Sequence, residues 1–187
     1  MKYFKKLVGE RIYLSPLSTE DYEQYVEWLN DFKVSDGIGS SANVATISSE
    51  KEWLESSSKS NNYPFAIVSL NENKLLGNCG LSNVNFIRRT ATLGIFIGNE
   101  EKRGLGIGKE AINLVLDYAF NYLNLNNVML NVFSFNEGAI KCYKSVGFKE
   151  FGRRREAYFL NGKYYDDVHM DILKSEFKGS YILNKNI

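Results

Sequence analysis

Apolar and polar residues alternate with different periods along the chain, and the changes of period predict the order of strands and helices. An alternation that begins at Arg11 stops at Pro16 and predicts a strand. Ser18 then precedes apolar residues spaced three and four apart, so we expect it to cap a helix. Residues 35–48 are rich in Ser and Gly and predict a loop, after which Ser49 is expected to cap a second, short helix.

The middle of the chain has the pattern of strands. Residues 64–70 and 74–81 predict an antiparallel pair joined by a turn at 71–73. Residues 91–97 are almost wholly apolar, as in a central strand. Gly94 within that run predicts a β-bulge or a close approach of another backbone.

The last part of the chain mixes both periods. An amphipathic helix over 107–123 and a strand over 127–133 follow the central strand, an order typical of a parallel crossover. A shorter helix over 136–146 is expected to end at Gly147 in the left-handed conformation. A hairpin is expected around Asn161-Gly162.

Composition narrows the class of protein. Hydrophobic residues make up 44% and charged residues 24%, and no repeat or low-complexity linker appears, so we expect one domain over residues 1–187. The 23 basic and 22 acidic residues nearly cancel, which argues against nucleic acid or an anionic membrane as a partner.

The two cysteines, Cys79 and Cys142, lie far apart in sequence, which argues against a disulfide framework or a zinc site, and we expect no metal. No stretch approaches the roughly 18 apolar residues of a membrane span. We therefore expect an unprocessed protein in a reducing cytoplasm.

Residues 103–109, Arg-Gly-Leu-Gly-Ile-Gly-Lys, form a glycine-rich turn between a predicted strand and a predicted helix. Glycines let successive backbone N–H groups crowd against a ligand, and the helix N-terminus adds partial positive charge, so the turn suits a pyrophosphate. Two nucleotide motifs are excluded. A P-loop needs Ser or Thr where Glu110 stands, and the dinucleotide fingerprint needs a third glycine where Lys109 stands.

The turn matches Arg-x-x-Gly-x-Gly, and residues 136–148 contain an Asn, then Ala-Ile, a Tyr and a Gly-Phe in a second characteristic spacing. With these two motifs in this order, the chain resembles the GNAT superfamily of acetyl-CoA-dependent N-acetyltransferases over about residues 9–174. Residues 10–14, 28–31 and 159–167 look like the RimJ/RimL branch of that superfamily. The resemblance implies an α/β fold with a mixed central sheet of about seven strands, about four flanking helices, and splayed central strands that form the acetyl-CoA cleft.

The resemblance also implies which residues hold the cofactor. The end of the central strand is expected to pair with the pantetheine arm through its backbone, and the glycine-rich turn to hold the pyrophosphate. Asn136 matches a cofactor-contacting asparagine, and it is alternatively only the N-cap of its helix. The expected cofactor-binding residues are Phe96, Ile97, Gly98, Arg103, Gly104, Gly106, Gly108, Lys109 and Asn136.

Tyr143 matches the general acid of the family. A phenol with a pKa near 10 is a plausible proton donor to a departing thiolate, whose conjugate thiol has a pKa of about 8.5. The alternative is an aromatic side chain that only faces the core. Cys142 has no evident histidine partner, so direct transfer is favoured over an acyl-enzyme.

The sequence departs from the family at the general base. Many relatives carry a glutamate at the position of Thr92 or Leu93, and neither residue can take a proton. Other carboxylates remain open as substitutes, and His169 is expected to be packed or facing solvent, so no base is assigned. These carboxylates are Glu100, Glu101, Glu156, Asp166 and Asp167.

The resemblance implies direct acetyl transfer to a primary amine in a ternary complex, and the alternative is a CoA-binding sensor or interaction module with reduced catalysis. The acceptor is open among a protein N-terminus, a polyamine, an amino sugar and an antibiotic. Four acidic residues suit a cationic acceptor if they converge, namely Asp31, Asp36, Asp166 and Asp167. The basic runs 88–89 and 153–155 suit the 3′-phosphate of the cofactor, an acidic acceptor, or only solvent. A homodimer is also open.

Overall fold

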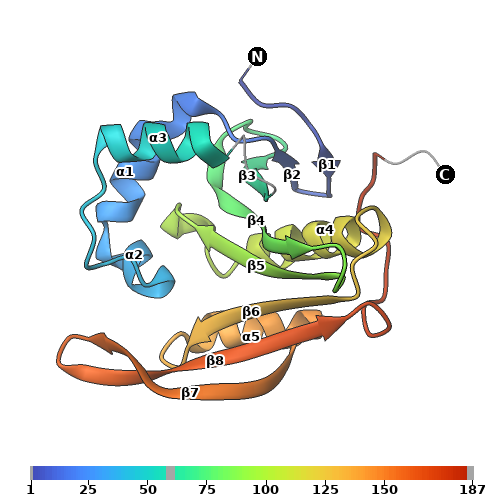
Figure 1. Ribbon diagram of the computed structural model, residues 1–187. Coiled ribbons are helices and arrows are strands. Elements are labelled where there is room, and N and C mark those ends of the chain that lie inside the picture. The colour runs from blue at the N-terminus through green and yellow to red at the C-terminus, as the bar shows by residue number, and fades with distance from the viewer. Residues whose placement is uncertain (1, 58–61, 185–187) are drawn as a thin grey trace.

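The computed structural model describes residues 2–57 and 62–184, which form one mixed sheet with helices on both faces (Figure 1). Within this part of the chain, the sheet has eight strands in the order β1-β2-β3-β4-β5-β6-β8-β7. The strands are β1 (Leu7–Val8), β2 (Ile12–Ser15), β3 (Tyr63–Ser69), β4 (Leu75–Asn85), β5 (Thr90–Ile97), β6 (Asn127–Phe133), β7 (Lys149–Leu160) and β8 (Lys163–Leu173).

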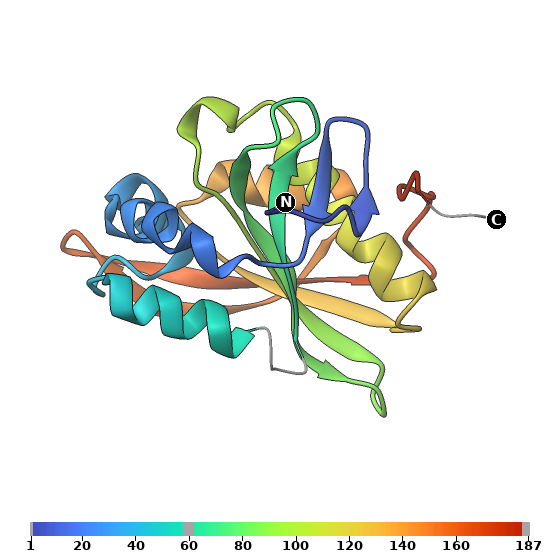
Figure 2. The same cartoon turned by 90° about the horizontal axis from the view of Figure 1, so that it is seen from above.

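The helices are α1 (Tyr22–Asn30), α2 (Phe32–Ile38), α3 (Ile47–Ser57), α4 (Ile107–Asn121) and α5 (Glu137–Val146), with short 3-10 turns η1 (Thr19–Asp21) and η2 (Glu100–Lys102). In two perpendicular views α4 and α5 lie on one face of the sheet and α3 on the other (Figures 1 and 2). The predicted α/β class is confirmed, with one strand and one helix more than expected.

The additional helix is α2, whose last four residues, 35–38, fall in the stretch that was predicted to be a loop. Asp31 caps it by accepting a hydrogen bond from the N–H of Lys33 at 2.9 Å, and Gly39 ends it with a φ of +73°. Both are ordinary helix-end signals. The loop prediction is correct for residues 39–46 and wrong for residues 35–38, where these two signals outweigh the local Ser and Gly content.

The start of α3 also differs from the prediction. Thr46, rather than Ser49, precedes the first helical residue. The N–H of Thr46 donates to Ser49 Oγ at 2.9 Å, and the N–H of Ser49 donates to Thr46 Oγ1 at 3.1 Å. This reciprocal pair is a capping box that begins three residues earlier than expected.

All neighbouring strands pair antiparallel except β5 and β6. These two pair in parallel only from 90–92 to 127–129, after which they diverge (Figure 1). Gly94 lies in unbroken register with Gly80, and a Cβ added to Gly94 would meet nothing within 4 Å. The predicted bulge or close approach at Gly94 was therefore wrong, and the irregularity lies between Ser82 and Asn85 instead.

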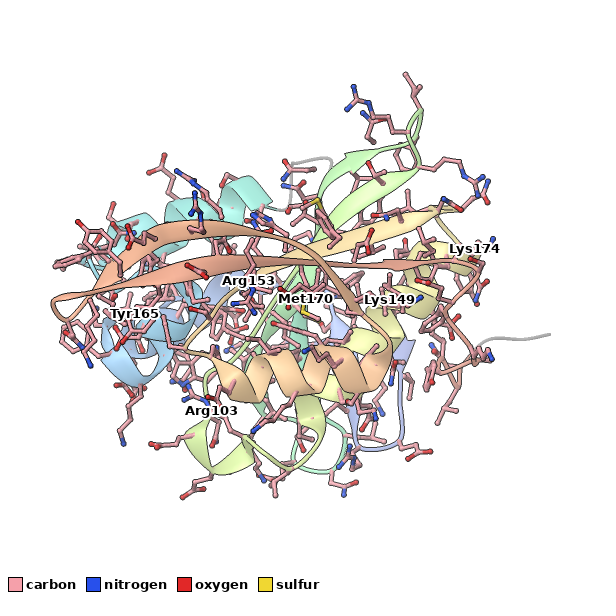
Figure 3. All side chains as sticks on the ribbon, turned by 90° about the horizontal axis from the view of Figure 1, so that it is seen from below. Arg103, Lys149, Arg153, Tyr165, Met170 and Lys174 are labelled. Carbon is pink, nitrogen blue, oxygen red and sulfur yellow. The ribbon has the colours of Figure 1, made fainter. Side chains whose placement is uncertain are left out.

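The β7–β8 hairpin forms the far edge of the sheet. Its turn at Asn161 and Gly162 has φ values of +49° and +78°, as the sequence predicted. Arg153 lies on the outer strand, whereas Met170 on β8 is fully buried (Figure 3).

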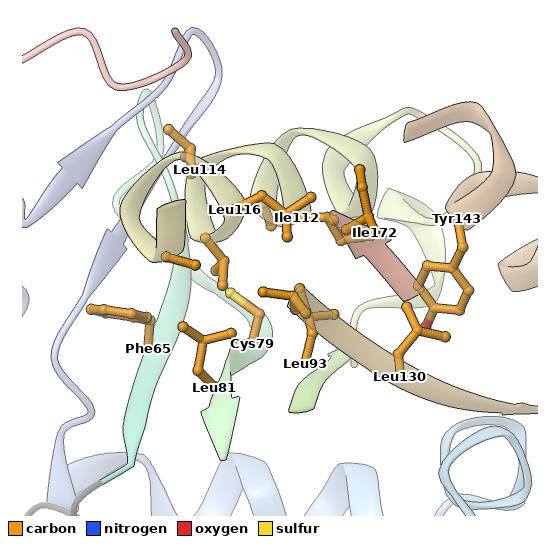
Figure 4. Close-up of a cluster of buried hydrophobic side chains, with 14 of the residues drawn as sticks. Phe65, Cys79, Leu81, Leu93, Ile112, Leu114, Leu116, Leu130, Tyr143 and Ile172 are labelled. Carbon is orange, nitrogen blue, oxygen red and sulfur yellow. The ribbon is translucent and has the colours of Figure 1, made fainter. Parts of the chain in front are cut away.

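The main core lies between α4 and the sheet (Figure 4). Ile112, Leu114 and Leu116 of α4 are no more than 1% exposed and belong to the same cluster as Leu81 and Leu93. Each such buried side chain stabilises the fold by about 1.5–3 kcal/mol. This packing fixes the N-terminus of α4 beside the end of β5. In residues 2–57 and 62–184 no helix is both long and apolar enough to cross a bilayer.

Candidate active site

A cleft of about 1320 Å³ opens where β5 and β6 diverge. Its walls come from β4, β5, β6, α2, α5 and the turn that leads into α4. The predicted site residues that line it are Phe96, Ile97, Arg103, Gly104, Gly106, Gly108, Lys109, Asn136 and Tyr143. Gly98 does not line the cleft.

Gly98 is buried against α1. A Cβ added to Gly98 would lie 2.1 Å from Trp28 Cδ2, and the N–H of Gly98 donates to the carbonyl of Leu76 on β4 at 2.9 Å. In an antiparallel strand the backbone N–H and C=O groups of successive residues point to opposite sides. Those of the even-numbered residues of β5 therefore point toward β4, as the bond of Gly98 does. Ile95 and Ile97 therefore direct their backbone groups toward the splayed gap.

The glycine-rich turn has the backbone that its sequence predicted. Gly104 and Gly106 have φ values of +73° and +81°, which residues with a side chain rarely adopt. Gly106 is the N-cap of α4, a helix of 15 residues. The free N–H groups of its first turn and the helix dipole place partial positive charge at the cleft.

Arg103 ties the turn to two neighbouring elements. Its Nε donates to the carbonyl of Ile97 and its Nη1 to the carbonyl of Lys33 on α2, both at 2.9 Å. Figure 3 shows its position beside the loop that enters α4. The side chain thus links the end of β5 to α2. Arg103 therefore has a structural role, whether or not it also contacts a ligand.

Tyr143 lies on α5 beside Leu130 of β6 (Figure 4). Its side chain lines the cleft although it is only 9% exposed. Burial, with a smaller effect from Cys142, raises the pKa of Tyr143 to about 12. The phenol therefore keeps its proton across the neutral range, as a proton donor must. Gly147 ends α5 with a φ of +119°, as predicted.

Asn136 is the N-cap of α5, which is one of the two roles expected for it. Its Oδ1 accepts a hydrogen bond from the N–H of Ala139 at 3.2 Å. The same side chain lines the cleft, and a Cβ added to Gly37 of α2 would lie 3.3 Å from its Nδ2. Asn136 thus fixes the start of α5 where α2 approaches it.

Of the four acidic residues expected to suit a cationic acceptor, two line the cleft and two do not. Asp36 and Asp167 line the cleft, and in each the Oδ1 atom is buried without a hydrogen-bond partner among the described residues. A buried carboxylate oxygen without a donor is costly, so each favours a ligand that brings one.

Asp31 and Asp166 instead serve the fold. Asp31 caps α2. Asp166 Oδ1 accepts the N–H of Glu156 at 3.1 Å, and its Oδ2 lies 3.6 Å from Arg153 Nη1. Neither residue lines the cleft.

The other groups considered as a base lie outside the cleft walls. Glu100 pairs with Lys33 at 2.8 Å. His169 contacts Asn131 Oδ1 through Nδ1 at 2.8 Å and stands beside the ring of Phe151. Glu101, Glu156 and Thr92 do not line the cleft either, whereas the apolar Leu93 does.

One wall of the cleft is aromatic, and the sequence did not predict it. Phe133 and Phe135 line the cleft, with ring centroids 5.6 Å apart, and Tyr158 stacks on Phe133 at 4.1 Å. The one available signal was the pair of phenylalanines immediately before Asn136. Aromatic faces beside carboxylates suit a cation with apolar flanks.

The basic runs contribute no lining residue. Arg153 pairs with Glu150 at 2.6 Å, and Arg89 Nε donates to the carbonyl of Asn124 at 2.7 Å. Cys79 and Cys142 are both free and both line the cleft, and burial raises the pKa of each thiol. The described residues contain no group of three or more His, Cys, Asp or Glu placed to hold a metal ion.

Known proteins with the same architecture include acetyltransferases. The spermidine N(1)-acetyltransferase of Vibrio cholerae is 37% identical over 111 residues, which are 59% of this chain and 64% of that enzyme, so the match spans slightly less than two thirds of the relative. The probable N-acetyltransferase YjcK of Bacillus subtilis is 28% identical over 183 residues, 91% of this chain and 98% of that protein.

Solved structures agree with this fold. The crystal structure of spermidine N-acetyltransferase from Vibrio cholerae in complex with CoA and spermine has a TM-score of 0.80 at 28% identity, covering 89% of this chain and 97% of that one. The family model described as an acetyltransferase (GNAT) domain matches residues 14–169. The chain therefore belongs to the GNAT family of acetyltransferases.

Proposed function

We propose that this protein is an acetyl-CoA-dependent N-acetyltransferase that passes the acetyl group directly to a primary amine in a ternary complex. The observation that carries the proposal is the convergence in one cleft of the free edge of β5, the glycine-rich turn and the protonated phenol of Tyr143. Together they provide places for the thioester, the pyrophosphate and the departing sulfur.

In this proposal the backbone N–H groups of the turn, from Gly104 to Lys109, bind the pyrophosphate. The backbone groups of Ile95 and the N–H of Ile97 hold the pantetheine arm, since Arg103 occupies the carbonyl of Ile97. A neutral amine attacks the thioester carbon, and a C–N bond forms as the C–S bond breaks. Tyr143 donates its proton to the sulfur, and the attacking nitrogen releases one proton to solvent. The deprotonated phenol then recovers a proton from solvent.

We propose a small cationic amine as acceptor. Asp36 and Asp167 supply the negative charge, and the rings of Phe133 and Phe135 cover the apolar part of the molecule. The same carboxylates are the acidic groups in the cleft wall that can take the ammonium proton, directly or through water. The spermidine N-acetyltransferases among the relatives support an acceptor of this class.

A second acceptor class is a protein N-terminus. The resemblance to the RimJ/RimL branch favours it, as does a putative ribosomal N-acetyltransferase of Bacillus subtilis, which is 33% identical over 110 residues. Two free cysteines fit a reaction in the reducing cytoplasm.

The test is thiol release from acetyl-CoA with a panel of polyamines, amino sugars, aminoglycosides and N-terminal peptides, with a no-acceptor control. We expect turnover with polyamines or other small cationic amines. Turnover with N-terminal peptides alone would replace the acceptor assignment. Tight CoA binding by calorimetry without turnover on any amine would favour the sensor alternative, and absence of CoA binding would contradict the proposal as a whole.

A further inference from the structure

Arg11 connects the start of β2 to the glycine-rich turn. It precedes β2 and does not line the cleft. Its Nη1 donates to the carbonyl of Leu105 at 2.6 Å. Leu105 lies between Gly104 and Gly106, the two residues of the turn that have positive φ.

Glu110, in the first turn of α4, holds Arg11 in place. Its Oε2 accepts from Arg11 Nε at 2.8 Å, and its Oε1 accepts from the backbone N–H groups of Arg11 at 2.9 Å and Ile12 at 3.3 Å. A Cβ added to Gly9 would lie 2.5 Å from that Oε1, so this carboxylate fills the space that the glycine leaves. The guanidinium itself makes two hydrogen bonds, to Glu110 and to the carbonyl of Leu105, which hold it in one orientation against the turn.

The charges of this pair have opposite effects on a phosphate. The carboxylate of Glu110 is favourable at the start of α4 but repels an anion bound at the same helix end. Arg11 offsets that repulsion. Its Nη2 lies 3.1 Å from the position that a Cβ on Gly106 would take, so the cation rests against the turn. The carbonyl of Leu105 is satisfied by Arg11.

We propose that Arg11, held by Glu110, is a positioning residue. It orders the glycine-rich turn and supplies positive charge for the pyrophosphate of the acyl donor. This inference rests on the proposed function, because it assigns Arg11 to the CoA end of the same cleft.

The test compares two acyl donors, acetyl-CoA and S-acetylpantetheine, which lacks the pyrophosphate. In Arg11→Ala we expect KM for acetyl-CoA to rise about tenfold, because the turn loses its hydrogen bond to Arg11 and the pyrophosphate loses a nearby positive charge, while kcat at saturation changes less than about twofold. The kcat/KM for S-acetylpantetheine should stay at the wild-type value. A role in folding alone would lower the rates with both donors together.

Three further variants sharpen the comparison. Arg11→Lys keeps the charge without the planar fork, so its KM should fall between wild type and Arg11→Ala. Adding Glu110→Gln to Arg11→Ala should recover part of the lost affinity, because the unopposed carboxylate is gone. Arg88→Ala removes an exposed arginine of the β4–β5 turn and should leave both donors unaffected.

Calorimetry with CoA distinguishes failure of the proposed function from failure of the role of Arg11. If the wild-type protein does not bind CoA, the proposed function fails and this inference with it. If the wild type binds CoA and Arg11→Ala binds it equally well, only the role of Arg11 is overturned. An equal loss of rate with both donors in Arg11→Ala would overturn that role as well.

Discussion

Tyr143 keeps its proton because burial penalises the phenolate. Its pKa of about 12 keeps the side chain protonated throughout the neutral range. In the proposed mechanism the side chain is therefore protonated before the donor binds. Because a thiol with a pKa of about 8.5 is the stronger acid, proton transfer from this phenol to a free thiolate is uphill, and donation requires the bound substrates to lower the pKa of Tyr143.

Removal of the hydroxyl in Tyr143→Phe should lower kcat about 100-fold or more, because general acid catalysis contributes 10²–10⁴-fold. The ring that packs on Phe148 remains, so KM for acetyl-CoA and the free energy of unfolding should change little. Thiol release and urea unfolding measure these quantities. Undiminished kcat would show that another group, or water, protonates the sulfur.

Asp36→Asn and Asp167→Asn should each raise KM for a cationic acceptor about tenfold and leave KM for acetyl-CoA unchanged, since each removes one charge from the acceptor side. Glu27→Gln, on the exposed side of α1, is the matched control. The measurement is a KM series at two salt concentrations, because screening should shrink the difference. Equal KM in all three variants would contradict the acceptor assignment.

At the level of elements, the end of β5 is fixed from two sides. Trp28 of α1 packs on Gly98, and Arg103 bonds the carbonyl of Ile97. The glycine turn and the helix boundary at Gly147 were predictable because local backbone geometry requires those residues. The bonds of Arg103, and the burial of Gly98 away from the cleft, depend on where α1 and α2 pack, which local spacing does not encode.

Two glycines at and just beyond β5 should respond differently to alanine. Gly98→Ala should lower the free energy of unfolding by about 1–3 kcal/mol, because a Cβ there overlaps the rigid ring of Trp28. Gly94→Ala should change it by less than about 1 kcal/mol, because its Cβ would meet nothing within 4 Å. Urea unfolding of the pair measures the difference. Equal stability would contradict the packing of α1 on the end of β5.

At the level of the whole molecule, residues 181–183 near the C-terminus contact the edge strand β1 and helix α4. Leu183 donates its N–H to the carbonyl of Val8 at 2.8 Å, and the buried Asp117 of α4 accepts the N–H groups of Tyr181 and Ile182. The order of strands and helices from 63 to 173 followed from periodicity. The contacts of residues 181–183 did not follow from periodicity, because they join positions far apart in sequence.

Buried tyrosines should make the fold sensitive to alkali. Burial raises the pKa of Tyr3, Tyr13, Tyr25, Tyr118 and Tyr143 above the ordinary value of 10.0. Below about pH 10 these groups are neutral in both states, and above it the unfolded chain releases protons that the folded chain keeps. The free energy of unfolding should therefore fall as pH rises past 10.

Urea unfolding at a series of pH values from 8 upward, read beside the ultraviolet absorbance of tyrosinate, measures this effect. Tyr25→Phe should reduce the slope, because Tyr25 is almost fully buried and carries one of these raised pKa values. Complete ionisation of all 12 tyrosines near pH 10 in a folded protein would contradict the burial of these side chains.

Direct acetyl transfer in the cleft between β5 and β6 is the central claim, and the most direct measurement follows the acetyl group itself. The protein is mixed with acetyl-CoA that carries a labelled acetyl group and with the best amine of the panel, and the amine and the intact protein are analysed by mass spectrometry at short times. Direct transfer predicts label on the amine nitrogen and none on the protein. Absence of labelled amine, or a labelled protein that forms first and then passes its acetyl group to the amine, would contradict it.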